Sequence, residues 1–321
     1  MLEPKPERCP KECAPTGNWI FGRSLHLAVY ALALSGTVLG CTRAEVNPKT
    51  PPPANPSAPD AMPPSSWQPS RSSHGALRDT PGELTVLDWA GFKGAVSYTF
   101  DDANSSQIEH FPELRALGVR MTFYLITSKP EARDATWQQA LRDGHEIGNH
   151  THTHQIQGTL EDIDAAQDFL ERTLGVRPTT MAAPYGAAMY SALAPHRFFI
   201  NRGVRNGLIA PNDASDPFNL NCYVPEPNAV AAALNEQVDA ARAAGKWRII
   251  LVHGFAGGTD QAYQPIELRE FVSSVEHAKG LGDVWIDTVE NIGAYWLGQR
   301  AFSRASRELH GGTTTWRWQL P

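Results

Sequence analysis

From about residue 83 onward, short apolar runs alternate with longer amphipathic segments, and this alternation limits the possible folds more than any other feature. Short apolar runs are typical of buried strands, whereas apolar residues recurring at helical spacing indicate helices. A regular succession of strands and helices predicts a parallel α/β architecture, either a barrel or an open sheet. In both architectures the functional side chains gather at the carboxyl ends of the strands.

The predicted elements follow one another closely along this part of the chain. Strands are expected at residues 95–100, 119–126, 145–148, 179–183, 198–204, 248–252 and 284–286. Helices are expected at residues 106–117, 137–143, 159–174, 228–244 and 266–279. No internal repeat is visible in the sequence, and one large domain accounts for the succession.

The first 80 residues have a different composition and predict an exported protein. Residues 25–39 form an uncharged, mostly apolar run. Such a run is shorter than the roughly 20 residues that cross a bilayer, and it fits the apolar part of a secretory signal peptide. The sequence VLGC ending at Cys41 is similar to a bacterial lipobox, although its leucine is larger than the residue usual there. Residues 1–41 are therefore expected to be a signal peptide with Cys41 as the lipidated residue. An ordinary signal peptide with an incidental cysteine is the alternative.

A proline-rich stretch separates this leader from the rest of the chain. Residues 47–70 contain nine prolines and only two charged side chains. Proline favours extended, solvated backbone, so residues 42–80 are expected to be a disordered linker. Residues 81–300 form the expected main domain, and the tail at 301–321, with alternating tryptophans, predicts an added strand. This order is that of a lipoprotein anchored to a membrane of the bacterial cell envelope, with a periplasmic or secreted protein as the alternative.

Charge and cysteine usage narrow the classes of partner. The chain has 34 acidic and 28 basic residues and a net charge of −6, without a basic block. Nucleic acid is therefore not expected as a partner. Three of the four cysteines precede residue 45 and leave Cys222 alone in the body of the chain, so no disulfide framework is predicted. We expect a monomer.

Two adjacent acids follow the first predicted strand. Asp101 and Asp102 come directly after the apolar run at 95–100. The backbone turns where a strand ends, so both carboxylates can approach one site. A carboxylate that binds a metal stays ionised, whereas its neighbour can accept a proton from water. A helix cap or an acid pair in a loop is the alternative.

The sequence HTHTH at residues 150–154 supplies three histidines. His150 and His154 have the spacing that places two imidazoles on one face of a helical turn, where they can share a cation. His152 lies between them and should point elsewhere. Two imidazoles and one carboxylate leave positions open for water and substrate, as a catalytic metal requires. A polar, histidine-rich loop is the alternative.

These motifs together resemble the polysaccharide deacetylase family, which is carbohydrate esterase family 4 with its NodB homology domain. TFDD, ending at Asp102, is followed further along the chain by GHEIGNHTHTH, ending at His154. The resemblance covers about residues 83–297 and implies a distorted (β/α) barrel that binds one divalent metal. Zinc (Zn2+) is the usual metal, and Co2+ or Ni2+ would also suit the ligands. By position, Asp101 is then the catalytic base, and Asp102, His150 and His154 are the metal ligands.

One later motif departs from the family. AAPYG at residues 182–186 is similar to the family's Arg-x-Pro-Tyr-Gly element, but Ala182 stands where the arginine that orients the catalytic acid belongs. The backbone N–H of Tyr185 can still stabilise an oxyanion. Arg202 and Arg205, near the end of the next predicted strand, are the nearest replacements in sequence order. We slightly favour Arg202, and exposed surface arginines are the alternative.

The last motif is LVHG, which begins at Leu251. In the family this leucine lines the pocket for the acetyl methyl group, and the following histidine, here His253, protonates the leaving group. The family also has an acid that tunes this histidine. Asp213 and Asp216 are the candidates for that role here.

The resemblance implies a metal-dependent hydrolase that removes N-acetyl groups from a polysaccharide containing N-acetylglucosamine, either chitin-like or peptidoglycan. One alternative is an esterase that acts on an O-acetylated glycan such as xylan with the same site. The other is a lipoprotein that binds glycan with little catalysis, which the alanine at position 182 suggests. Retention of Asp101 and His253 argues against this last alternative, because binding alone needs neither a base nor an acid.

Overall fold

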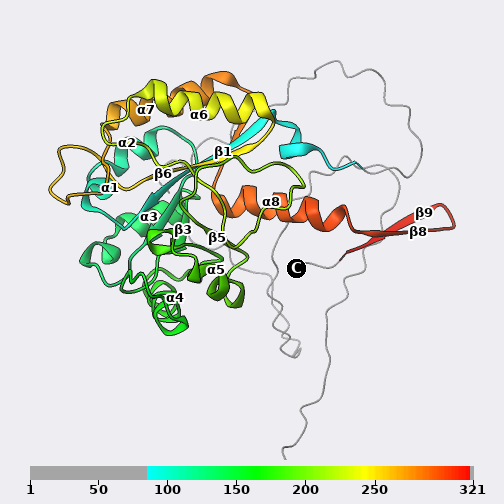
Figure 1. Ribbon diagram of the computed structural model, residues 1–321, viewed down its shortest axis with the longest axis horizontal. Helices are drawn as coiled ribbons and strands as arrows, with labels where there is room; N and C mark the ends of the chain where they lie inside the picture. The colour runs from blue at the N-terminus through cyan, green and yellow to red at the C-terminus, as the bar shows by residue number, and fades with distance from the viewer. Residues whose placement is uncertain (1–84, 319–321) are drawn as a thin grey trace, which may run out of the picture.

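The computed structural model describes residues 85–318, and its core is a parallel sheet. The predicted signal peptide, Cys41 and the linker lie outside the described residues. Within them, seven strands form the sheet in the order β5-β4-β3-β2-β1-β6, with β7 also paired to β1 (Figure 1). The strands are β1 (Gly94–Asp101), β2 (Thr122–Leu125), β3 (Glu146–Asn149), β4 (Thr180–Ala182), β5 (Ile200–Arg202), β6 (Trp247–Val252) and β7 (Val284–Ile286). The predicted strands are all present; β2, β4 and β5 are shorter than expected, whereas β1 and β6 are longer.

The sheet curls into a distorted barrel. One edge of β1 pairs with β6 over most of its length, whereas the other edge is shared by β2 near Asp101 and by β7 near Gly94. An irregular segment then fills the space between β5 and β6, since Leu220 bridges to Arg202 and Tyr223 bridges to Ile250. The expectation of a distorted (β/α) barrel is confirmed.

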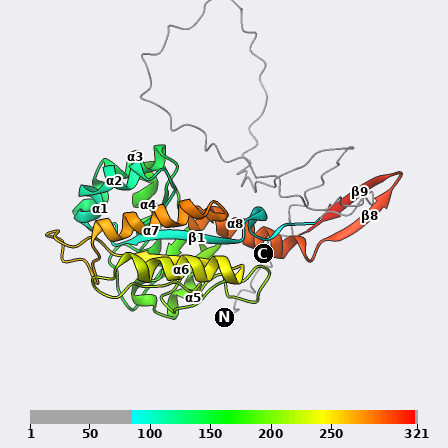
Figure 2. The ribbon, with the colours of Figure 1, turned by 90° about the horizontal axis from the view of Figure 1, so that it is seen from above.

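Helices surround the curled sheet (Figures 1 and 2). They are α1 (Ser105–Glu109), α2 (Phe111–Ala116), α3 (Thr136–Arg142), α4 (Leu160–Leu174), α5 (Met189–Leu193), α6 (Ala231–Ala244), α7 (Leu268–Leu281) and α8 (Val289–Phe302). The single helix expected at 106–117 is two short helices, because Pro112 is tolerated only in the first turn of a helix and so starts α2. Between residues 85 and 318, no helix has both the length and the apolar character that a membrane crossing needs.

Alternation along the strands separates the side chains of β1 into two sets. Val96, Tyr98 and Phe100 belong to the core between the sheet and the helices. Ala95 instead belongs to a second core inside the barrel, together with Trp247. Successive side chains of a strand face opposite ways, so Asp101 lies on the inner face with Ala95. At the carboxyl end of β1, the carboxylate of Asp101 therefore faces the interior of the barrel.

The N-terminus of α8 enters the barrel and meets a buried carboxylate. The Glu290 N–H donates to Glu146 Oε2 at 2.9 Å, and the hydroxyls of Thr122 and Thr180 also donate to this carboxylate. Burial, followed by the charge of Glu290, raises the pKa of Glu146 to about 7. The sequence analysis missed α8 because apolar residues such as Ala294, Tyr295 and Phe302 lie outside the stripe that it buries.

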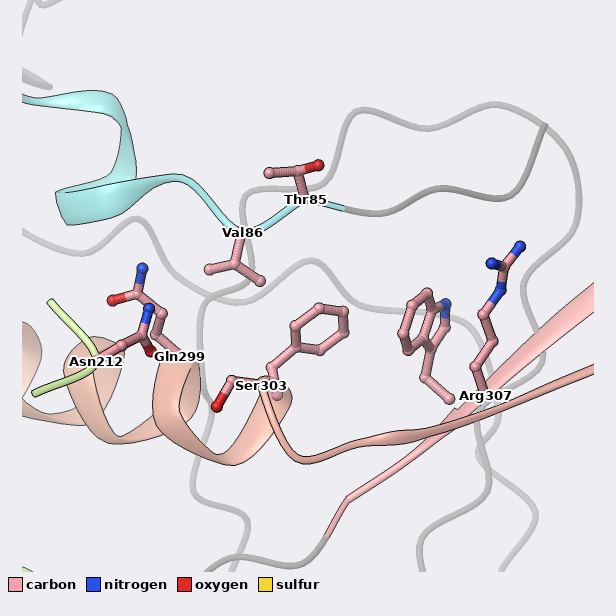
Figure 3. A pocket seen from close by; sticks show the side chains of 8 residues that line it. Thr85, Val86, Asn212, Gln299, Ser303 and Arg307 are labelled. Carbon is pink, nitrogen blue, oxygen red and sulfur yellow. The ribbon is translucent and has the colours of Figure 1, made fainter. Parts of the chain in front are cut away.

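The tail forms a separate hairpin at the carboxyl-terminal end of α8 (Figure 2). Its strands β8 (Ser306–His310) and β9 (Thr313–Arg317) pair antiparallel with each other, so the expected tail strand forms but pairs with the tail itself. A cavity of about 400 Å³ lies between the hairpin, α8 and the chain that enters the domain (Figure 3). Its lining residues are Thr85, Val86, Asn212, Gln299, Phe302, Ser303, Arg307 and Trp316.

Candidate active site

Four strands of the barrel deliver the candidate residues to one end. Asp101 is the last residue of β1, and Arg202 is the last residue of β5. His150 and His253 follow the ends of β3 and β6. Because parallel strands end at the same edge of a barrel, residues far apart in sequence meet there.

The acid pair has two different environments. Asp101 is 2% exposed and lies on the inner face, whereas the backbone turns sharply at Asp102, whose φ is 80°. This left-handed turn keeps both carboxylates beside the same imidazole. His150 Nε2 lies 3.6 Å from Asp101 Oδ2 and 3.4 Å from Asp102 Oδ1. Burial opposes the charge of Asp102, but His150, His253 and His154 together outweigh it and hold the pKa of Asp102 well below its usual range.

Asp102, His150 and His154 form a cluster that fits a divalent metal. Each offers one ligand atom, and these atoms lie within 4.8 Å of one another. His150 Nδ1 lies 2.8 Å from the carbonyl oxygen of Ala182, so it carries the proton and leaves Nε2 free as a ligand atom. Asp102 Oδ1 is buried and has no hydrogen-bond partner among the described residues. A buried carboxylate oxygen without a partner is costly unless a cation meets it.

The two histidines reach the cluster from a loop, so the expected helical turn is wrong. Thr151 and His154 both have a positive φ, 63° and 56°, which a right-handed helical turn excludes. The Thr151 hydroxyl accepts a hydrogen bond from the His154 N–H at 3.0 Å and so fixes the loop. His152 turns away, as expected, and its Nδ1 lies 2.9 Å from the Thr127 hydroxyl.

Arg202 holds Asp101. Its guanidinium is fully buried, and Nη2 donates to both carboxylate oxygens, with 2.5 Å to Oδ1. Arg202 is the in-register neighbour of Ala182 on the adjacent parallel strand. An arginine on β5 therefore stands beside the position on β4 where the family motif would have placed one.

Three other candidates lie outside the cluster. Arg205 is exposed, and its Nε donates to Asn221 at 3.3 Å. Asp213 accepts hydrogen bonds from the backbone of Ala210 and Ser215, and Asp216 accepts one from the Phe218 N–H. Both acids thus cap their own loop instead of approaching the histidine that they were expected to tune. Sequence order could not show this, because the spacing of residues along the chain does not reveal the path that a loop takes.

His253 and Leu251 lie at the end of β6. Leu251 is 1% exposed, and the carbonyl oxygen of His253 accepts hydrogen bonds from Asn104 and Gln107, both at 2.7 Å. Burial lowers the pKa of His253, although the charges of Asp101 and Asp102 oppose the shift. Sequence reasoning did not single out Asn104 and Gln107, because polar residues just after an acid pair carry no motif of their own.

Tyr185 covers the other side of the cluster. Its side chain is 63% exposed, and its ring centroid lies 4.6 Å from that of His154. The backbone of Tyr185 also has a positive φ of 55°. The tyrosine is therefore part of the rim of the site.

Comparisons with known proteins agree with this geometry. Residues 91–196 match the family model described as polysaccharide deacetylase, a stretch that contains Asp101, Asp102, His150, His154 and Tyr185. This part of the chain is similar to a polysaccharide deacetylase domain.

Two curated relatives align with part of this chain. A gellan lyase of a Bacillus species is 30% identical over 158 residues, which are 46% of this chain and 6% of that protein. The peptidoglycan-N-acetylmuramic acid deacetylase PdaC of Bacillus subtilis (strain 168) is 31% identical over 101 residues, 28% of this chain and 21% of that protein. The chain thus spans well under two thirds of these relatives.

A solved structure supports the fold of the deacetylase domain. The crystal structure of a candidate polysaccharide deacetylase from Mycobacterium smegmatis matches with a TM-score of 0.50 and 18% identity, covering 68% of this chain and 96% of that one. At this identity the likeness concerns the barrel alone. The family model ends before β5, so Arg202, Leu251 and His253 rest on the geometry described above.

Proposed function

We propose that the deacetylase domain is a metal-dependent hydrolase that removes N-acetyl groups from a polysaccharide containing N-acetylglucosamine, chitin-like or peptidoglycan. The observation that carries the proposal is the meeting of two sets of residues at one end of the barrel. Asp102, His150 and His154 bring three ligand atoms together. Asp101, held by Arg202, lies 3.6 Å from the same His150. A pure binding site would need no buried, oriented carboxylate beside a metal cluster.

In the proposed reaction each residue has one task. A divalent metal, Zn2+ by default and Co2+ or Ni2+ as alternatives, would polarise the acetyl carbonyl and activate water when bound. Asp101 accepts the proton of the attacking water, and Arg202 holds its carboxylate in place. The Tyr185 N–H donates to the developing oxyanion, and Leu251 lines the space for the methyl group. His253 protonates the departing amine.

The test is acetate release by purified, metal-loaded protein from chitooligosaccharides, peptidoglycan fragments and acetylxylan, with and without a chelator. We expect release from the N-acetylated substrates, loss with the chelator and recovery on adding zinc. Asp101→Asn should abolish turnover, whereas His152→Ala is the matched control, because this histidine lies beside the cluster without joining it. Release from acetylxylan alone would point to an O-acetyl esterase. Glycan binding without any release would point to a binding protein.

We also propose that the protein is exported and anchored through a lipid on Cys41. The support comes from the sequence: an apolar run at residues 25–39, a lipobox-like VLGC and a proline-rich spacer. A single acyl chain gives only reversible binding to a bilayer, so firm anchoring would need the two signals that lipoprotein maturation supplies. An anchored enzyme would act on a polymer within reach of its spacer.

A further inference from the structure

Two exposed tyrosines rest against two histidines of the candidate active site. Tyr263 is 63% exposed, and its ring lies edge-to-face with His253 at 86°, with the centroids 5.2 Å apart. Tyr185 is also 63% exposed and rests on His154. By contrast, Phe255, which lies in the same loop as Tyr263, is 1% exposed. Of these two aromatic residues in the loop, Tyr263 is therefore the one that is exposed to solvent.

The loop that carries Tyr263 is hydrogen-bonded to α1, the short helix that follows the acid pair. The Ala256 N–H donates to the Ile266 carbonyl at 2.9 Å, which closes the base of the loop. Ser106 binds it twice: its N–H donates to Asp260 Oδ2 at 2.7 Å, and its hydroxyl accepts from the Phe255 N–H at 3.1 Å. Ser106 belongs to α1, directly after the acid pair. The position of Tyr263 relative to the acids is therefore set by hydrogen bonds.

A closely approaching glycine at the base of the loop supports this arrangement. A Cβ on Gly254 would lie 2.6 Å from the Ser106 hydroxyl and 2.7 Å from the Ala262 side chain. Only a residue without a side chain lets the loop fold back onto α1 at this point. The loop is therefore built to bring Tyr263 to the rim beside His253.

The chemistry of the proposed reaction says what must pass this rim. His253 gives its proton to the amine, and the amine remains attached to the sugar. The polymer therefore lies on the His253 side of the acetyl carbon, and the acetate leaves on the other side. The exposed ring of Tyr263, which packs against His253, therefore lies on the side of the site where the sugar chain must pass.

We propose that Tyr263 is a specificity-determining residue that stacks on a pyranose ring of the polymer next to the acetylated unit. The inference rests on the proposed deacetylase function. A pyranose presents a face of C–H groups that packs on an aromatic ring, and the phenol O–H at the rim can reach a sugar hydroxyl. Tyr263 then makes the enzyme prefer oligomers over isolated acetylated units. It acts on substrate affinity and leaves the proton transfers to Asp101 and His253.

The test compares long and short substrates in Tyr263→Ala and Tyr263→Phe. For a chitopentaose, Tyr263→Ala should raise KM about three- to tenfold, the range expected for one lost aromatic contact, with kcat changed less than twofold. Hydrolysis of 4-nitrophenyl acetate, which is too small to reach the ring, should change less than twofold. Tyr263→Phe keeps the ring and should retain most of the affinity. Trp318→Ala is the matched control, since this tryptophan is 40% exposed but lies on the hairpin strand end beyond α8.

The outcomes separate this inference from the proposed function. If the wild-type enzyme releases acetate and Tyr263→Ala leaves the KM for the pentaose unchanged, the stacking role is wrong and the function stands. An equal loss on both substrates would mean that Tyr263 supports the catalytic cluster and does not bind the sugar chain, which also overturns the proposal. If no substrate is hydrolysed, the proposed deacetylase function is wrong. Titration calorimetry with the pentaose then tests the stacking role of Tyr263 by itself. Weaker binding by Tyr263→Ala supports stacking, and equal binding refutes it.

Discussion

Moving an arginine from β5 to β4 should transfer the support of the catalytic acid from one strand to the next. In Arg202→Ala, Asp101, which is 2% exposed in the wild-type structure, loses the guanidinium that contacts both of its oxygens. Removing one partner of a buried ion pair costs about 3–5 kcal/mol. Loss of a residue that orients a catalytic group costs about 10–100-fold in activity. We therefore expect a lower melting temperature and a kcat reduced by that factor at saturating metal.

The double variant Ala182→Arg, Arg202→Ala should recover much of this loss. The two positions are in-register partners on adjacent parallel strands, so their side chains leave the sheet on the same face. Neighbouring strands lie about 4.8 Å apart, a distance that the long stem of arginine can span. The Ala182 carbonyl that accepts from His150 belongs to the backbone and survives the substitution. We expect kcat to return to within about tenfold of wild type.

The assay is steady-state acetate release from a chitooligosaccharide, with bound metal and melting temperature measured for each variant. Arg205→Met is the control and should be nearly silent, because its exposed side chain contacts Asn221. Arg202→Lys keeps the charge but not the planar fork, so it should fall between wild type and Arg202→Ala. A folded, metal-loaded Arg202→Ala enzyme with wild-type kcat would refute the reasoning. A purely structural role would show as a lower melting temperature with unchanged kcat.

Three further predictions concern the metal cluster, the barrel interior and the leader. The double variant His150→Ala, His154→Ala should bind less than about one-tenth equivalent of zinc by elemental analysis, with His152→Ala as control; stoichiometric metal in the double variant would contradict the assignment. Glu146 has its folded pKa raised to about 7, so its stabilising protonated form is present in acid and lost as the pH rises through that value. Glu146→Gln should therefore gain up to about 3 kcal/mol of stability over wild type between pH 5 and pH 8, and a gap that shrinks with pH would be the wrong sign. Cys41→Ser should move the protein from the membrane to the soluble fraction or leave its signal uncleaved, and wild-type protein that is already soluble after export would refute anchoring.

The strands and the meeting of the motifs could be predicted because their signals are local. Apolar runs mark the strands, and the end of a parallel strand marks the place of chemistry, where Asp101 was expected. The role of His253 came instead from the resemblance of LVHG to a family motif. Arg202 was also slightly favoured over Arg205, and β5 ends at Arg202, three residues before Arg205. The structure places only Arg202 against Asp101.

Other features depend on backbone shapes that residue spacing does not reveal. The loop after β3 reaches the cluster through left-handed residues such as Thr151, so the spacing of its histidines mimicked a helix. The loop containing Asp213 folds back on itself, and its acids could not be placed from sequence order. Helix α8 packs Val289, Ile292 and Trp296 against the barrel, but apolar residues on its other faces obscure this pattern in the sequence. Each of these was set by tertiary contacts.

The left-handed backbone conformations around the metal cluster lower the stability of the fold at positions that the chemistry needs. Five non-glycine residues here have a positive φ: Asp102, Ala103, Thr151, His154 and Tyr185. Each such residue costs of order 1–3 kcal/mol, so the rim of the site is a reservoir of strain that the rest of the barrel offsets. Glycine would relax any of them, but at four positions it would remove a ligand, a loop hydroxyl or the rim tyrosine. Only Ala103, a buried methyl group, has no such role. Substitutions that relieve this strain would raise the stability of the fold. At most of these positions, however, they would remove a residue that the chemistry needs.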